Sequence, residues 1–206
     1  MSEEFGTFEM VPAGRRPSRG NRDNAPSSQQ RTVLRVSTGH SRHEGALLVA
    51  TDGSALGNPG PGGWCWFVDE QTYEAGGDPG PVTNNQMELI ALTRCLLALG
   101  EHTDAIIEVD SQYVLNAVGK WHHSWRRNGW RNSKGEPVAN RELIEKLLEL
   151  LEDRHKAGTR TDLRWVKAHN GSWRNENADT RAREAAGSAV SAGRVIVRRV
   201  GSLNAD

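Results

Sequence analysis

Two short apolar segments of this sequence run directly into an aspartate. Asp52 follows the segment 46–51 (ALLVAT), and Asp110 follows the segment 105–109 (AIIEV). Because ligand sites in open α/β sheets gather at strand ends, these two carboxylates are candidates for chemistry. The stretch 53–63 after Asp52 holds five glycines, which allow another molecule to approach the backbone closely.

Two further acids lie at element boundaries. Glu88 stands in the first turns of a segment with a helical pattern, and Asp179 stands in a later one that follows His169. If the four acids converge, they cannot all stay ionised without compensation, and Mg²⁺ with oxygen ligands supplies it. Two such ions can activate a water and stabilise the leaving oxygen in phosphodiester cleavage. Residue by residue, a structural alternative stays open: a strand-terminal aspartate more often caps a turn or helix than binds a ligand, and a lone histidine is more often structural than catalytic.

The elements that must position these acids form an α/β pattern. Strands are expected over 46–52, 62–70, 71–77, 105–110 and 161–169, and helices over 83–99, from 111, over 140–156 and over 174–186. Thr83 and Gln86 have the spacing of a capping box, and Asn140 is expected to cap the third helix. Three hairpin-type strands followed by alternating helices and strands predict one mixed sheet with helices packed on it.

The composition limits the class of protein. Lys and Arg together number 26, as do Asp and Glu, so any basic nucleic-acid footprint must be local. Two cysteines without a CxxC motif argue against a disulfide scaffold or a structural zinc site and suit a reducing cytoplasm. No apolar run is long enough for a membrane span, and the acidic start has no signal core, so we expect a cytoplasmic protein without a membrane partner, by default a monomer.

The two ends of the chain differ in composition from the middle. Residues 1–44 are rich in Pro, Gly, Ser, Asn and Arg, which predicts a disordered N-terminal tail, although 32–36 has the character of a strand fragment. Residues 187–206 are interpreted as a C-terminal tail in which 195–200 has the character of an edge strand. The domain is therefore expected over 45–186.

The segment 119–135 is a local basic footprint. It contains five cations and three tryptophans but no acid: Lys120, Arg126, Arg127, Arg131, Lys134, Trp121, Trp125 and Trp130. Interleaved cations and aromatic rings suit phosphate neutralisation and packing against sugars and bases. The alternative is an amphipathic helix whose tryptophans lie in the core and whose cations are merely solvated.

Four segments of the chain resemble the motifs of type 1 ribonuclease H, in the same order and with similar spacing. They are TDGSALGNPGPGG (51–63), TNNQMEL (83–89), DSQYV (110–114) and WVKAHNG…NENADTRA (165–182). The resemblance covers roughly residues 46–186 and points to the branch that bears a basic protrusion, here 119–135. It implies a five-stranded mixed sheet flanked by helices. It also implies cleavage of the RNA strand of an RNA–DNA hybrid duplex with two Mg²⁺ ions, or Mn²⁺, leaving 5′-phosphate and 3′-hydroxyl ends.

The resemblance also implies roles for individual residues. The acidic quartet and the mobile catalytic histidine of the family match Asp52, Glu88, Asp110, Asp179 and His169. Positions that contact the minor groove of the hybrid, where 2′-hydroxyls identify RNA, match Asn58, Asn84, Asn85 and Gln112. Thr83 matches a position beside a DNA phosphate, and the protrusion is a handle for the DNA strand. Turn and helix-start roles remain the alternatives for the three asparagines. Ala168 and the segment 172–174 depart from the family pattern near His169.

Three functions compete. The first is a divalent-metal endonuclease on RNA–DNA hybrids. The second is a non-catalytic hybrid-binding module on the same fold, which the presence of all four acids disfavours. The third is a nuclease or transposase of the same fold that cuts DNA, which the protrusion, the asparagine and glutamine set and the histidine loop disfavour.

Overall fold

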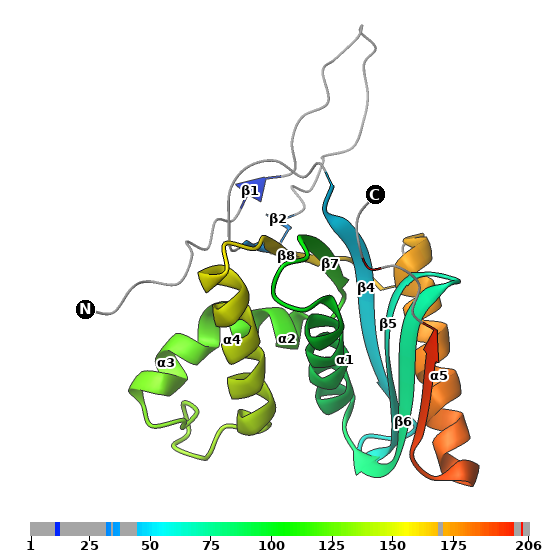
Figure 1. The fold of residues 1–206 in the computed structure, drawn as a ribbon. Helices are drawn as coiled ribbons and strands as arrows, with labels where there is room; N and C mark the ends of the chain where they lie inside the picture. Colours follow the sequence, from blue (N-terminus) through cyan, green and yellow to red (C-terminus); the bar gives the residue numbers. More distant parts are fainter. Residues whose placement is uncertain are drawn as a thin grey trace, which may run out of the picture.

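The computed structural model describes residues 11–12, 32–33, 35–37, 45–168, 171–199 and 203. Its centre is a mixed sheet with the strand order β3-β8-β7-β4-β5-β6-β9 (Figure 1). In that order the strands span Arg35–Ser37, Thr161–Trp165, Ala105–Val109, Leu47–Ala55, Gly60–Asp69, Thr72–Val82 and Val195–Arg199. The strands β4, β5 and β6 are antiparallel neighbours, whereas β7 runs parallel to β4 and β8 runs parallel to β7. Two further strands, β1 (Val11–Pro12) and β2 (Thr32–Val33), pair with each other.

The predicted five-stranded mixed sheet corresponds to β8, β7, β4, β5 and β6, and one strand is added at each edge. At one edge β3 pairs with β8, and at the other β9 pairs with β6 over Val195–Arg199, the segment interpreted as an edge strand. Both additions come from segments assigned to tails in the sequence. They extend the sheet because β8 and β6 would otherwise present unpaired backbone groups at its edges.

In the described part of the chain, six helical segments surround the sheet. They are α1 (Asn84–Leu99), α2 (Gln112–Asn116), the π-helical turn η1 (Ala117–Trp121), α3 (His122–Arg127), α4 (Arg141–Lys156) and α5 (Trp173–Ala192). The predicted capping box is confirmed, since Thr83 Oγ1 accepts from the Gln86 backbone and Gln86 Oε1 accepts from the Thr83 backbone. Asn140 stands at the predicted N-cap position of α4, but the side-chain cap expected there is missing. This residue has a φ of 60° and makes no side-chain cap, and its Nδ2 donates to the Tyr113 hydroxyl instead.

The last helix runs further than the sequence pattern indicated. We expected it to end at residue 186, but α5 continues to Ala192. The added residues include two alanines and two serines, and the helix ends at Gly193, which has a φ of 77°. A glycine with positive φ is a common helix terminator because it has no Cβ to clash. Val190 is the one large apolar residue in the segment 187–192, so the apolar repeat that marks a helix is absent from the final turns, which explains the early boundary.

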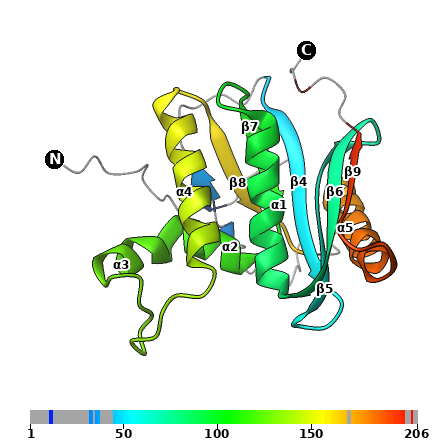
Figure 2. The ribbon, with the colours of Figure 1, turned by 60° about the horizontal axis from the view of Figure 1, so that its bottom comes forward.

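Helices cover both faces of the sheet, with α1 and α4 on one side and α5 on the other (Figure 2). The larger core cluster lies under α1 and α4 and includes Trp66, Leu92 and Ile107. The smaller cluster lies under α5, where alanines of the helix meet Cys65 and Phe67 of β5. None of the helices that the structure describes combines the length and the apolar character needed to cross a membrane.

Candidate active site

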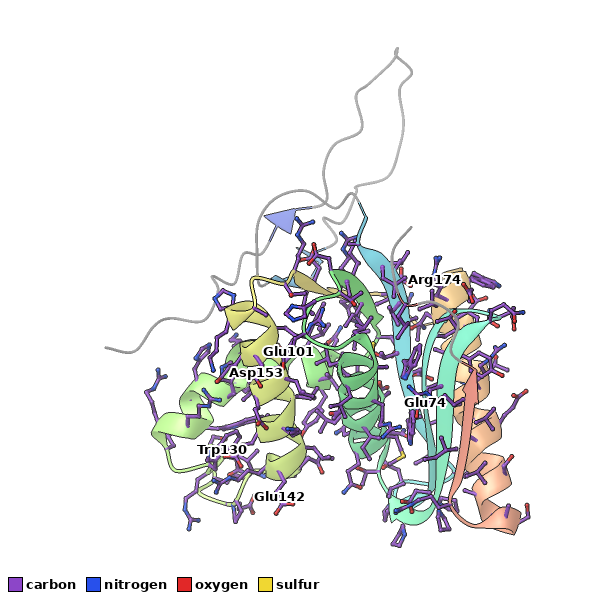
Figure 3. All side chains as sticks on the ribbon, in the orientation of Figure 1. Glu74, Glu101, Trp130, Glu142, Asp153 and Arg174 are labelled. Carbon is purple, nitrogen blue, oxygen red and sulfur yellow. The ribbon has the colours of Figure 1, made fainter. Side chains whose placement is uncertain are left out.

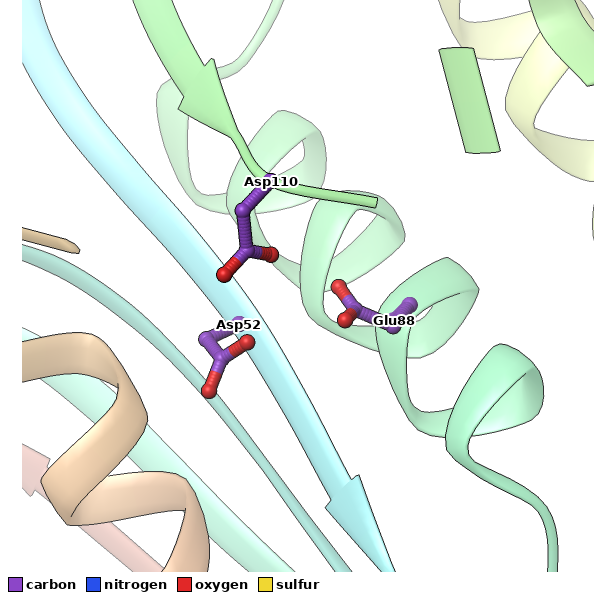
Figure 4. Close-up of side chains that lie close together, drawn as sticks. All are labelled: Asp52, Glu88 and Asp110. Atoms are coloured by element: carbon purple, nitrogen blue, oxygen red, sulfur yellow. The ribbon is translucent and has the colours of Figure 1, made fainter. Parts of the chain in front are cut away.

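Three carboxylates from separate elements meet beside the central strand (Figure 4). Asp52 lies within β4, Glu88 lies in α1, and Asp110 follows β7. One oxygen of each carboxylate lies within 4.8 Å of the others. The structure therefore brings together three of the four acids by direct approach of their oxygens.

Strand pairing places two of these acids side by side. Thr51 of β4 pairs in parallel with Val109 of β7, so the next residue on each strand is an aspartate. Glu88 reaches the two aspartates from α1, because Gly53 lets this helix pack directly on β4. A Cβ at Gly53 would lie 2.1 Å from the backbone nitrogen of Glu88, so any larger residue would push the helix away.

The fourth acid, Asp179, approaches from the other face of the sheet. It is held on α5, and α5 packs on β5 at Gly63, where a Cβ would lie 2.0 Å from the carbonyl oxygen of Ala182. The negative charge of Asp179 is one of the causes that raise the pKa of Asp52. Its own carboxylate also pairs with Arg183 Nε at 2.8 Å. A positive charge thus lies one turn away from the fourth acid on the same helix.

Two of the clustered acids, Asp52 and Glu88, are in an environment that disfavours their negative charge. Burial, followed by the charges of Asp110 and Asp179, holds the pKa of Asp52 well above its ordinary range. Burial and the charges of Asp52, Asp110 and Asp179 likewise raise the pKa of Glu88 well above its usual value. Both groups are disfavoured in the ionised form that a water-exposed carboxylate would adopt at neutral pH.

The donor set fits a hard divalent cation. The buried Glu88 Oε2 has no hydrogen-bond partner among the residues that the structure describes. An unsatisfied buried carboxylate oxygen within a group of three carboxylates is the arrangement that a cation with oxygen ligands relieves. Asp52, Glu88 and Asp110 are therefore the residues that would hold a divalent metal, with Asp179 beside them.

The predicted catalytic histidine, His169, lies outside the described residues. The described backbone resumes at Gly171, whose N–H donates to Glu176 Oε1 at 3.1 Å. Ser172 then caps α5, and its hydroxyl accepts from the backbone nitrogen of Asn175.

The polar residues predicted to contact the minor groove lie where β4 meets α1 and where α2 begins. The Ala55 N–H donates to Asn84 Oδ1 at 2.6 Å, and the Asn84 N–H donates to Asn58 Oδ1 at 3.2 Å. These bonds give Asn58 and Asn84 the turn and helix-start roles that the sequence left open. Both are also exposed, as are Asn85 and Gln112.

The tryptophans of the segment 119–135 form one continuous aromatic row. Ring centroids are 5.7 Å apart for Trp121 and Trp125 and 6.3 Å apart for Trp125 and Trp130, and Tyr113 extends the row on the Trp121 side. Trp130, labelled in Figure 3, is buried and belongs to the larger core cluster. The guanidinium of Arg141, at the start of α4, lies over its ring, 5.2 Å from the ring centroid. Its indole offers no open face to a nucleic-acid strand, as the core alternative required. Trp125 is half-buried and Trp121 is 37% exposed.

The cations of this segment are partly committed to the protein. Arg126 pairs with Glu152 at 3.1 Å, and Arg131 Nη1 donates to the carbonyl oxygen of Gly135 at 2.6 Å. Arg127 and Lys120 are exposed. The segment is therefore a basic surface anchored to the domain by its aromatic row.

One polar residue at this site, Asn175, was not predicted from the sequence. Asn175 of α5 is 2% exposed, and its Nδ2 donates to Asp110 Oδ2 at 3.3 Å. In the sequence only its position four residues before Asp179, in the NENAD motif, sets it apart.

A mixed α/β sheet with carboxylates gathered beside its central strands has the ligand set of an enzyme that uses a divalent metal for phosphoryl transfer. The RNase H family model matches residues 44–187. The ribonuclease H of Tropheryma whipplei (strain Twist) is 45% identical over 142 residues, which cover 68% of this chain and 84% of the relative. The ribonuclease H of Xanthomonas oryzae pv. oryzae (strain MAFF 311018) is 44% identical over 143 residues, covering 68% and 92%. The chain belongs to the RNase H family and is a ribonuclease H hydrolase.

Solved structures agree with this assignment. LC9-RNase H1, described as a type 1 RNase H with the type 2 active-site motif, is 27% identical with a TM-score of 0.50, covering 73% of this chain and 77% of its own. The foamy viral protease-reverse transcriptase in complex with an RNA/DNA hybrid shares the fold at a TM-score of 0.53 and 23% identity. That match covers 68% of this chain and 20% of the viral one.

We predict that Asp52→Asn stabilises the metal-free protein at pH 7, because it removes a carboxylate whose ionised form the fold disfavours. The pKa of Asp52 is higher in the folded than in the unfolded state, so its ionisation destabilises the fold as pH rises above about 4. About 1 kcal/mol corresponds to about 2–4 °C in a domain of this size, and we expect a melting-temperature gain of at least that order. The measurement is thermal unfolding with a chelator across a pH series.

The matched control is Asp153→Asn on α4, where the half-exposed carboxylate pairs with Lys156 and no gain is expected. The gain for Asp52→Asn should shrink as pH falls through about 4, the ordinary pKa of an unfolded aspartate, and should vanish at lower pH, where Asp52 is protonated in both states. A gain that does not change with pH would show that charge is not its origin.

Proposed function

We propose that this ribonuclease H hydrolyses the RNA strand of RNA–DNA hybrids with two divalent metal ions and leaves 5′-phosphate and 3′-hydroxyl ends. The observation that carries the proposal is the group formed by Asp52, Glu88 and Asp110, whose oxygens lie within 4.8 Å of one another inside the family domain. Mg²⁺ is the proposed ion, since it prefers a few carboxylates together with substrate phosphate, and Mn²⁺ is the proposed substitute.

The residues of the chain divide the work. Asp52 in β4 and Asp110 directly after the paired strand β7 would hold the ions rigidly, and Glu88 adds an oxygen that lacks a partner among the described residues. Asp179 is proposed as the fourth ligand, released from Arg183 as it binds. When bound, the ions would activate a water and neutralise the leaving oxygen. His169 is proposed to assist proton transfer or product release without binding metal.

Recognition of the hybrid is proposed to use two surfaces. The exposed asparagines at the start of α1 and the exposed Gln112 at the start of α2 would read 2′-hydroxyls in the minor groove, with Thr83 beside a DNA phosphate. The segment 119–135 would hold the DNA strand through Arg127, Lys120 and the exposed ring of Trp121. Arg126 and Arg131 would have to leave their present partners to join them. The second candidate, a non-catalytic hybrid-binding module, lacks support because all four acids are present.

The proposed setting is the cytoplasm, with the chain acting as a monomer. Cys65 and Cys95 are both free and buried, which supports a reducing compartment.

The test is cleavage of three end-labelled duplexes in Mg²⁺: RNA–DNA, RNA–RNA and DNA–DNA. We expect cuts only in the RNA strand of the hybrid, and we expect Asp110→Asn to abolish them while Asp153→Asn leaves them intact. Binding of the hybrid without cleavage by the wild-type chain would favour the binding module. Cleavage of the DNA duplex would favour the DNA nuclease.

His169→Ala should slow cleavage without preventing it. Positioned acid–base assistance contributes about 10²–10⁴-fold, so the variant should lose activity within that range and keep its metal affinity. Single-turnover cleavage and metal titration on the same preparation measure the two quantities. Loss of metal binding by this variant would contradict the role proposed for the histidine.

Replacing Arg126, Arg127 and Arg131 together with Ala should raise KM and leave kcat at saturating substrate largely unchanged. A remote group that binds ground and transition states equally has this effect when it is removed. Each phosphate that is no longer neutralised should also flatten the log–log salt dependence of binding by about 0.9, the coefficient for duplex DNA. Since three arginines are replaced, the slope should change by at most about 2.7.

The matched control is Lys146→Ala, which removes a cation on α4 that pairs with Glu149 at 2.7 Å. KM and kcat for both variants are to be measured across a salt series on one hybrid. An unchanged KM and salt slope in the triple variant would mean that the basic segment is only a solvated surface.

A further inference from the structure

The start of α5 is tied to β7 at two points. Ser172 Oγ donates to Glu108 Oε2 at 2.6 Å, and Asn175 Nδ2 donates to Asp110 Oδ2 at 3.3 Å. One residue separates these two acids in the sequence: Glu108 lies in β7, and Asp110 follows the end of the strand. The first turn of α5 therefore fixes the end of β7 from which one of the proposed metal ligands projects.

The side chain of Asn175 is unusual because it is buried and only one of its two polar atoms has a hydrogen-bond partner among the described residues. It is 2% exposed, and although its Nδ2 has Asp110 as acceptor, its Oδ1 has no hydrogen-bond partner in the described part of the chain. A buried amide oxygen without a donor costs free energy, and each such group in a native fold requires an explanation. A water carried by a cation at the neighbouring carboxylates is a donor that would satisfy it.

The choice of an amide also suits this environment. Four carboxylates already converge here, and burial and mutual repulsion raise the pKa of two of them, Asp52 and Glu88. An amide can donate to Asp110 without adding another negative charge, whereas a carboxylate in its place would add one. A ligand held by a second group keeps its orientation when the metal is absent, and such partners tune metal affinity.

We propose that Asn175 is a positioning residue of the metal site. Its Nδ2 orients Asp110 toward the cation, and its Oδ1 accepts a hydrogen bond from a water on that cation. This inference rests on the proposed function, because it requires the carboxylate group to bind a divalent metal.

A purely structural role can be separated from this one. The cap of α5 uses the backbone nitrogen of Asn175, which donates to Ser172 Oγ at 3.4 Å and is present in any non-proline residue at this position. Changing the side chain therefore leaves the cap in place. Leu approximates the shape of Asn and fills the buried space without hydrogen bonding, so Asn175→Leu tests the amide alone, and Asn175→Ala is the companion variant.

The control is Asn177→Ala on the same helix. The amide of Asn177 donates to the carbonyl oxygen of Trp173 at 2.9 Å and accepts from Arg181 at 2.8 Å, outside the carboxylate group. It thus removes an asparagine side chain of equal size that has local partners. A change in Mn²⁺ affinity that all three variants share would come from a disturbed α5 helix and not from loss of a contact to the metal site.

The experiment is calorimetric titration of the full-length, nucleic-acid-free protein with Mn²⁺, with thermal unfolding in a chelator to confirm that each variant is folded. We expect the Mn²⁺ dissociation constant to rise about 10–100-fold for Asn175→Leu and Asn175→Ala, the usual effect of removing a group that orients a ligand. Asn177→Ala should stay within about 2-fold of the wild-type chain, far below that effect.

A wild-type Mn²⁺ dissociation constant in either folded Asn175 variant would overturn the role of Asn175 and leave the metal site standing. If the wild-type chain itself bound no Mn²⁺, the inference and the proposed function would fall together. If only one Asn175 variant folds, that variant decides.

Discussion

Direct backbone contact between helices and the sheet is the constraint on which this structure depends. At Gly53 the backbone of α1 lies where a Cβ would be, and at Gly63 the backbone of α5 does the same on the opposite face. Each contact brings one acid-bearing helix to the central strands, α1 with Glu88 and α5 with Asp179. The parallel pairing of β4 and β7 supplies the other two acids. Without side chains between these layers, four carboxylates converge from four elements.

The same closeness makes the acids costly to ionise. Burial comes first among the causes that raise the pKa values of Asp52 and Glu88, and the neighbouring carboxylates add to it. A cluster of buried carboxylates lowers the stability of the metal-free fold and raises its affinity for a divalent cation. Arg183, paired with Asp179, offsets this repulsion only at the edge of the group. The frustrated arrangement is therefore understood as a site prepared for metal and, through it, for a phosphodiester.

Sequence reasoning predicted the parts of this fold that local patterns determine. The buried strand followed by Asp110, the capping box at Thr83 and the amphipathic α4 all follow from spacing and residue type. The strand expected to end at Asp52 instead continues to Ala55, because β4 stays paired with β5 beyond the aspartate. It missed features that depend on distant partners. The cap assigned to Asn140 failed because the side chain bonds to Tyr113, 27 residues away. The burial of Trp130 depends on packing against α4, and the bond from Asn175 to Asp110 spans 65 residues. No local pattern records such contacts.

The most direct test of the account is the dependence of unfolding free energy on Mg²⁺ concentration at pH 7. A ligand that binds only the folded state stabilises it by RT ln(1 + [Mg²⁺]/Kd), about 2.7 kcal/mol at a hundred times Kd. We predict this rise for the wild-type chain and its loss in the variant that combines Asp52→Asn with Asp110→Asn. A wild-type unfolding free energy that does not change with Mg²⁺, or an equal rise in the variant, would contradict the claim that these acids form the metal site.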